Sequence, residues 1–215
     1  MFLTIPDVLS KAEVAAIAAA ASDLTFQDGQ ATAGTFAKQV KANDQAAASP
    51  ERDAILAKVA NSLTAHPVFA SAARPRALTQ LILSRYRQGQ TYGSHVDDAL
   101  MQGLRTDISF TLFLSDADTY DDGSLVISDT LEDRAIKLNA GSVILYPSTS
   151  LHHVAPVHTG TRLAIVGWVQ SWVRDPAQRE ILFDLDRCIA GSDEKEMRDT
   201  LLKTRSNLLR MWAAS

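Results

Sequence analysis

The chain has 215 residues, and 21 lysines and arginines against 25 aspartates and glutamates leave a formal net charge of −4. This near-neutral balance argues against a protein that binds nucleic acid by neutralising many phosphates. A hydrophobic fraction of 46% is ordinary for a globular protein, and a chain of this size can bury a substantial core. The single cysteine, Cys188, excludes an intrachain disulfide and a zinc site made of several cysteines.

The beginning of the chain carries no pattern typical of export or membrane insertion. The first residues lack a basic stretch followed by a long apolar run, and the alanine-rich stretch at 15–21 is too short and too weakly apolar to span a bilayer. We therefore expect no membrane association and no nucleic-acid partner. A reducing, cytoplasmic setting is the simplest expectation.

The first third of the chain has the pattern of two helices. Ser10 followed by Glu13 is a capping box, and it opens an alanine-rich helix that extends to about Ser22. Ser49 and Pro50 form a second helix start, and the dipeptide at 66–67 is expected to end that helix. Residues 27–48 are small and polar, which predicts a loop with at most a short strand.

From Leu78 the apolar period changes from helical spacing to two, which is the spacing of strands. The expected strands are 78–86, 108–114, 124–127, 134–138, 142–146 and 163–173. Turn compositions separate several of them, at 121–123, 139–141 and 158–160. Many short strands without intervening helices indicate an antiparallel sandwich or barrel.

Helical patterns return after the strands. Asp175 and Pro176 form an N-cap followed by proline, Gly191 interrupts the pattern, and Ser192 opens a last helix with several apolar residues. We expect one α+β domain with three regions. Residues 1–77 are a helical region packing on the core, 78–174 are the core, and 175–215 are a C-terminal helical region.

A histidine and a carboxylate stand two residues apart at His95 and Asp97. In an extended chain both side chains project from the same face, so both can bind one metal ion. A second histidine would complete the facial triad of two histidines and one carboxylate that holds Fe(II) and leaves positions open for other ligands. On its own, the pair also fits a hydrogen-bonded pair at the surface.

A second segment with candidate functional residues lies on one of the last predicted strands. It contains His152 and, ten residues further, Arg162. A turn at 158–160 would fold the arginine back beside the histidine. A planar guanidinium suits a carboxylate, which it can bind through two parallel hydrogen bonds. A metal site with an arginine nearby would suit a dicarboxylate that chelates the metal at one end.

These segments resemble the Fe(II)/2-oxoglutarate-dependent dioxygenases of the prolyl-4-hydroxylase type, and most closely the bacterial PKHD-type hydroxylases. The resemblance is carried by "SRYRQGQTYGSHVD" (84–97), "RTDISFTLFLSDADTYDDGSLVISD" (105–129) and "AGSVILYPSTSLHHVAPVHTGTRLAIVGWVQSWVRD" (140–175). It continues weakly into both flanks. It implies a double-stranded β-helix (jelly roll) core with flanking N- and C-terminal helices.

The resemblance also implies roles for particular residues. The iron ligands would be His95, Asp97 and His152, which would therefore be the catalytic centre. Arg162 would bind the distal carboxylate of 2-oxoglutarate, and two tyrosines, Tyr86 and Tyr92, would line the cosubstrate pocket. Fe(II) would couple oxidative decarboxylation of 2-oxoglutarate by O₂ to hydroxylation of a substrate, with L-ascorbate as the reductant that restores the iron.

Two other classes of function remain open at this stage. A cupin-like metal-binding sensor without oxygenase activity would keep the histidines but would not need the arginine. A hydrolase that uses a zinc-bound water would work without O₂. The substrate is also open, between a peptide, an amino acid and a small molecule, and the apolar residues of the last helix could form a homodimer surface.

Overall fold

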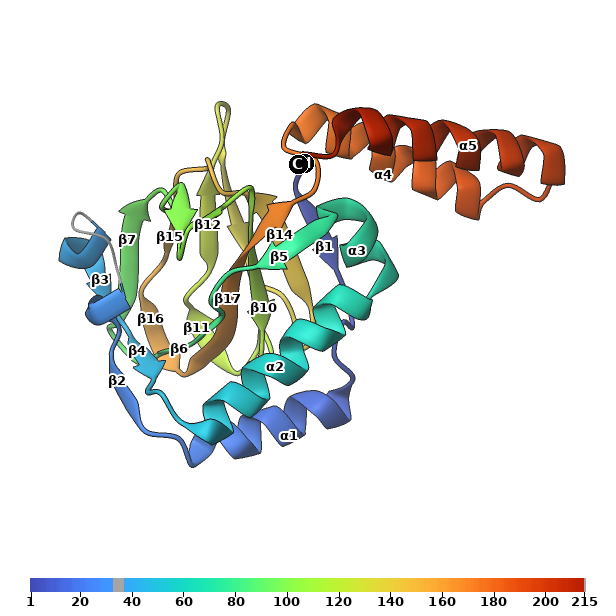
Figure 1. The fold of residues 1–215 in the computed structure, drawn as a ribbon. Coiled ribbons are helices and arrows are strands. Elements are labelled where there is room, and N and C mark those ends of the chain that lie inside the picture. The colour runs from blue at the N-terminus through green and yellow to red at the C-terminus, as the bar shows by residue number, and fades with distance from the viewer. Residues whose placement is uncertain (33–36, 215) are drawn as a thin grey trace.

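The computed structural model describes residues 1–32 and 37–214, which form two antiparallel sheets and flanking helices (Figure 1). In these residues the larger sheet has eight strands: in order β1 (Leu3–Ile5), β14 (Val143–Pro147), β10 (Ile108–Phe113), β17 (Arg162–Ser171), β6 (Ile82–Tyr86), β4 (Asp44–Ala46) and β2 (Phe26–Asp28), with β5 (Pro75–Leu78) paired to β17. The smaller sheet has the order β13 (Asp133–Ile136), β12 (Leu125–Ser128), β15 (His152–Val154), β7 (Thr91–His95) and β3 (Lys41–Ala42). Two short ribbons complete the strands: β11 (Tyr120–Asp122) with β16 (Val157–Gly160), and β8 (Leu100–Met101) with β9 (Leu104–Arg105).

The central strand β10 shows why the larger sheet is covered on both faces. All six of its residues are buried. Phe110 and Leu112 belong to the main hydrophobic core, whereas Phe113 belongs to a second cluster together with residues of β12 and β14. Because successive side chains point to opposite faces, one face of β10 packs on the helices and the other faces the smaller sheet. The double-stranded β-helix predicted from the sequence is confirmed.

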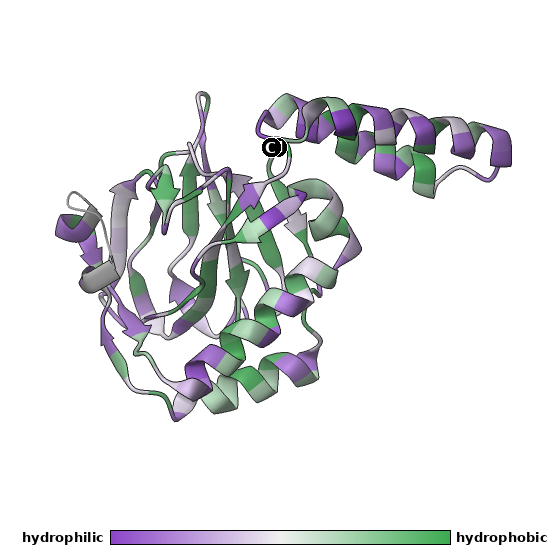
Figure 2. Ribbon diagram, viewed as in Figure 1, coloured by the Kyte–Doolittle hydropathy of each residue, from purple (hydrophilic) through white to green (hydrophobic). Residues whose placement is uncertain are grey.

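Three helices precede most of the strands: α1 (Lys11–Ser22), α2 (Pro50–Ala65) and α3 (Pro67–Ala73). Figure 1 shows α1 and α2 lying along one side of the β core, and Figure 2 shows hydrophobic residues along them. The predicted capping box is present at the start of α1, where the Ser10 hydroxyl accepts from the Glu13 amide. The short α3 was not predicted, because Pro67 ends one helix and also occupies the first turn of the next, where its missing N–H costs nothing.

The chain ends in a hairpin of two helices, α4 (Pro176–Ala190) and α5 (Lys195–Trp212), which extends away from the β core (Figure 1). Asp186 fixes the base of this hairpin. Its carboxylate lies 2.6 Å from Arg74 of the body and 2.9 Å from Arg205 of α5. No residue of α5 is buried. No helix within residues 1–32 and 37–214 is long and apolar enough to cross a membrane.

The prediction of a loop at 27–48 was wrong for the part that the structure describes; residues 33–36 lie outside it. The segment contains β2, two short 3₁₀ turns η1 (Gly29–Thr32) and η2 (Ala37–Val40), and then β3 and β4. These strands lack alternating apolar residues because several of their buried side chains are polar. The usual signal of a half-buried strand was therefore missing.

The turn predicted at 158–160 was also wrong. Residues 157–160 form β16, which pairs with β11, and the chain reverses only after Gly160. Gly160 has a φ of +79°, and a Cβ added there would lie 2.4 Å from the Thr119 carbonyl oxygen. Only glycine fits this reversal without strain.

Candidate functional site

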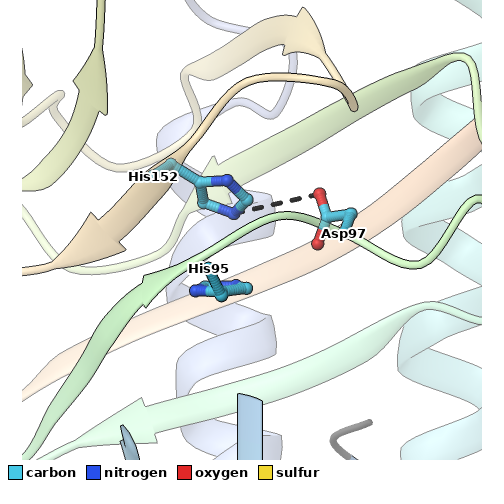
Figure 3. Close-up of side chains that lie close together, drawn as sticks. All are labelled: His95, Asp97 and His152. Carbon is cyan, nitrogen blue, oxygen red and sulfur yellow. Dashed lines mark ion pairs between the residues drawn. The ribbon is translucent and has the colours of Figure 1, made fainter. Parts of the chain in front are cut away.

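Three predicted ligand residues meet where two neighbouring inner strands of the smaller sheet, β7 and β15, end and begin. His95 ends β7, His152 begins β15, and the two residues are directly paired across these neighbouring strands. Asp97 follows two residues after His95. One potential ligand atom from each side chain lies within 4.8 Å of the other two. Figure 3 shows the three side chains converging, with the Nε2 of His152 3.8 Å from Asp97 Oδ2.

Backbone carbonyls fix the orientation of both imidazoles. The Nδ1 of His95 lies 2.8 Å from the Gly93 oxygen, and the Nδ1 of His152 lies 3.0 Å from the Ser150 oxygen. Because a carbonyl can only accept, each Nδ1 carries the proton and each Nε2 keeps a free lone pair. Metal-binding histidines are held in this way in proteins, with the second ring nitrogen bonded to a carbonyl or carboxylate.

A serine pair orients the carboxylate. The Ser109 hydroxyl donates to Asp97 Oδ2 at 2.5 Å, and the Ser148 hydroxyl lies 2.8 Å from Ser109 Oγ. Both serines are buried and belong to strand β10 and to the turn after β14. The carboxylate is therefore held by the larger sheet, although it follows a strand of the smaller one. Sequence reasoning missed both serines, because nothing in their local pattern distinguishes them from other strand residues.

The electrostatics of the site favour a neutral imidazole at His95. Burial is the largest cause and the neighbouring His152 the next, and together they lower the pKa of His95 to about 4. A neutral imidazole is the form that binds a metal. Two imidazole nitrogens and one carboxylate oxygen match the facial triad of Fe(II) sites, and the donor set contains no thiolate. The residues present therefore fit an Fe(II) ion.

Arg162 lies at the start of β17 and is 1% exposed, although its guanidinium is permanently charged. The guanidinium carbon lies 5.1 Å from the Tyr86 ring centroid and 5.3 Å from that of Phe113. Its Nε and Nη1 have no hydrogen-bond partner among the described residues. A buried charge with open donors is costly unless an anion fills the site, so this position suits a carboxylate.

The two predicted tyrosines also reach the site. Tyr86 is paired with Arg162 across β6 and β17, and burial raises its pKa to about 12 against the effect of the arginine charge. The ring of Tyr92 stacks on His95 with centroids 3.7 Å apart. All six residues predicted for the site line one cavity, namely Tyr86, Tyr92, His95, Asp97, His152 and Arg162.

The cavity has further polar walls that the sequence analysis did not identify. Lys41, Asn43 and Gln45 line it from the N-terminal segment, and the indole of Trp168 lines it from β17. The prediction of a loop at 27–48 gives these residues of the segment no inward or outward face. Alternation of polar residues at 41, 43 and 45 was the available signal.

The family-model comparison matches residues 81–170 to the 2OG-Fe(II) oxygenase superfamily. The fold and the site agree with that class: the chain is an Fe(II)- and 2-oxoglutarate-dependent dioxygenase, with O₂ as its second cosubstrate. A PKHD-type hydroxylase from Maricaulis maris is 50% identical over 87% of this chain and 88% of its own length. One from Picosynechococcus sp. is 45% identical over 99% of this chain and 100% of its own. The chain belongs to the PKHD-type hydroxylases.

Solved structures confirm the fold at greater evolutionary distance. A prolyl hydroxylase from Trichoplax adhaerens, determined with a peptide fragment of the hypoxia inducible factor oxygen degradation domain, has a TM-score of 0.60. It is 16% identical and covers 79% of this chain and 83% of its own. At that identity the likeness concerns the fold alone.

Proposed function

We propose that His95, Asp97 and His152 hold the catalytic Fe(II) through the two Nε2 atoms and one carboxylate oxygen. The observation that carries this proposal is the pair of hydrogen bonds from the Nδ1 atoms to backbone carbonyls, which leaves both Nε2 atoms available within one small cluster. Three protein ligands on one side leave the opposite side for small ligands. The iron supplies the redox chemistry that converts 2-oxoglutarate, O₂ and a C–H bond into succinate, CO₂ and an alcohol.

The protein's part in this reaction is to bind, orient and exclude water. We propose that Arg162 binds the distal carboxylate of 2-oxoglutarate, with Tyr86 beside it, while Tyr92 packs on His95 and forms the wall next to the metal. Support comes from the burial of the guanidinium and its open donors. Apolar residues, among them Leu125 and Val154, also line this cavity. They limit the access of water, which strengthens the charge interactions of the bound anion.

The test is succinate formation from 2-oxoglutarate under air, measured with added Fe(II). The proposal predicts turnover by the wild type and none by His95→Ala or Asp97→Ala. Arg162→Ala should act mainly by raising the concentration of 2-oxoglutarate that gives half-maximal succinate formation. Normal succinate production by His95→Ala would disprove the assignment of the iron ligands. A matched control is His153→Ala, because His153 pairs with Val126 on β12 and lies outside the ligand cluster.

Three further assignments belong to the proposal. L-ascorbate is the reductant that restores the iron after turnover without substrate, and its test is whether ascorbate prolongs succinate formation. The primary substrate is a small molecule or a peptidyl residue, and nucleic acid and membrane are not partners. A reducing, cytoplasmic location is supported by a lone cysteine, Cys188, that is exposed and not part of a disulfide.

We also propose that the α4–α5 hairpin forms a homodimer surface. It carries large apolar side chains that are about half or more exposed, at Ile181, Met197 and Met211. Large exposed apolar side chains on a projecting element suit a protein interface. Light scattering of the wild type and of a Met197→Glu variant tests this: the proposal expects a dimer that the charge weakens, and a monomeric wild type would contradict it.

A further inference from the structure

The two-stranded ribbon of β11 and β16 lies at the Arg162 end of the cavity. Tyr120 of β11 is paired with Gly160 of β16, and the chain reverses after that glycine and begins β17 with Arg162. Tyr120 and Arg162 therefore stand at the same corner of the fold, although they are far apart in the sequence. The function proposed above uses no residue of this ribbon.

The side chain of Tyr120 is held from several sides. It is buried, and it packs in one apolar cluster with Tyr86, Val154 and Val157. The Nζ of Lys137 donates to the Tyr120 backbone oxygen at 2.6 Å and lies 4.2 Å from the centre of the ring. The ring therefore has little freedom to move, and its hydroxyl keeps a fixed place.

Two glycines leave the space that Tyr120 fills. A Cβ added at Gly123 would lie 3.2 Å from two carbons of the Tyr120 ring, and one added at Gly160 would lie 3.0 Å from the Tyr120 Cβ. Contacts this short are tighter than ordinary packing, so a larger residue at either position would press on the tyrosine. This corner of the fold is thus built around a large aromatic side chain.

The Tyr120 hydroxyl lies beside the guanidinium of Arg162. Burial raises the pKa of Tyr120, whereas the charge of the guanidinium and a side-chain hydrogen-bonding interaction with it lower that pKa. The rings of Tyr86 and Phe113 lie near the same guanidinium, with their centres 5.1 Å and 5.3 Å from its carbon. Tyr120 adds what these two ring contacts lack, an oxygen that can accept from the guanidinium N–H groups.

From this arrangement we infer that Tyr120 is a positioning residue for Arg162, which it holds ready for the far carboxylate of a 2-oxo dicarboxylic acid. Tyr120 is not among the residues that line the cavity, so it acts through the arginine. An arginine held in one orientation before the anion arrives loses less side-chain freedom on binding, which strengthens binding. The inference rests on the proposed function, because it takes Arg162 as the residue that binds the distal carboxylate.

The test compares 2-oxoglutarate with 2-oxopentanoate, which has a methyl group in place of the distal carboxylate. Protein loaded with Mn(II) is titrated with 2-oxoglutarate by calorimetry, and 2-oxopentanoate is measured by displacement. Tyr120→Phe removes the hydroxyl and keeps the ring. It should weaken 2-oxoglutarate binding by about fivefold or more and leave the affinity for 2-oxopentanoate within about twofold of the wild type. Unchanged affinity for 2-oxoglutarate, or an equal loss for both acids, would overturn the inference.

Two controls separate this inference from its alternatives. Val157→Ala removes apolar packing from the same cluster and should leave the preference for 2-oxoglutarate unchanged; a loss equal to that of Tyr120→Phe would overturn the inference. In an Arg162→Ala protein, adding Tyr120→Phe should cause no further loss of 2-oxoglutarate affinity, because the two residues act as a unit. A further loss of about fivefold would show that Tyr120 acts independently, which also overturns the inference. No effect of Arg162→Ala alone would instead refute the proposed function.

Discussion

The hydrogen bond from Ser109 to Asp97 gives the sharpest test of how the larger sheet supports the site. Ser109→Ala removes the 2.5 Å contact to Oδ2 and leaves the carboxylate without its donor from β10. A hydrogen bond to a charged group contributes about 1.5–3 kcal/mol, which corresponds to about 10- to 150-fold in an equilibrium constant. Removing a partner that orients a metal ligand typically costs about 10- to 100-fold in metal affinity. We therefore expect Mn(II), used as a redox-stable probe for Fe(II), to bind this variant at least about tenfold more weakly.

The assay is a titration of the metal-free protein with Mn(II), followed by the EPR signal of the unbound ion. Ser84→Ala is the matched control, because Ser84 is also buried and lines the same cavity from β6. It should bind Mn(II) like the wild type. A Ser109→Ala protein with wild-type affinity would refute the view that the serine pair fixes the carboxylate. An equal loss in both variants would point to a general effect on the fold.

Three further predictions concern the cosubstrate, the fold and the buried lysine. Arg162→Ala should weaken 2-oxoglutarate binding, measured by calorimetry on the Mn(II) protein, by about 30-fold or more, since a buried charge pair is lost; unchanged affinity would contradict the assignment. Gly160→Ala should lower the free energy of unfolding by about 2 kcal/mol or more, measured by urea denaturation. Gly103→Ala should lower it by less, because Gly103 has a similar positive φ but open space where the Cβ would stand. Equal losses of unfolding free energy in the two variants would contradict the steric argument. Burial lowers the pKa of Lys41 to about 8 in the folded state, so above pH 8 the unfolded chain binds more protons than the folded one. The free energy of unfolding of the wild type should therefore rise relative to that of Lys41→Met between pH 8 and 10, by at most about 1.4 kcal/mol per pH unit. A difference between the two proteins that stays constant over this pH range would contradict the prediction.

The strand core was predictable because its residues follow a simple rule. Phe110 and Leu112 belong to the main hydrophobic core, whereas the polar Ser109 and Thr111 line the cavity, and the sequence shows this alternation directly. The N-terminal segment followed no such rule. Its inward residues, such as Lys41 and Asn43, are polar because they line a cavity, and an inward polar residue looks like an outward one in a sequence.

The candidate site was predictable as a set of residues but not as a geometry. His95 and Asp97 are close in sequence, so strand spacing alone suggested a common ligand. His152 joins them only because β15 pairs with β7, and pairing between distant strands is not visible in local pattern. The route by which Arg162 reaches the cavity was also mistaken, since residues expected to form a turn form β16.

The supporting residues were the least predictable part. Ser109 on β10 is hydrogen-bonded to Asp97, and Ser148 in the turn after β14 is hydrogen-bonded to Ser109. A buried serine has no distinctive sequence neighbourhood, so only the folded chain shows which serine meets which carboxylate. The backbone carbonyls of Gly93 and Ser150 carry no side-chain signal at all.

The most direct test of the central claim is a crystal structure of the protein with Mn(II) and 2-oxoglutarate. We predict a metal bound by Nε2 of His95, Nε2 of His152 and one carboxylate oxygen of Asp97, with the distal carboxylate of 2-oxoglutarate on Arg162. The Nδ1 atoms should keep their hydrogen bonds to backbone carbonyls. A metal bound through Nδ1 or at another site, or a cosubstrate carboxylate away from Arg162, would contradict the account.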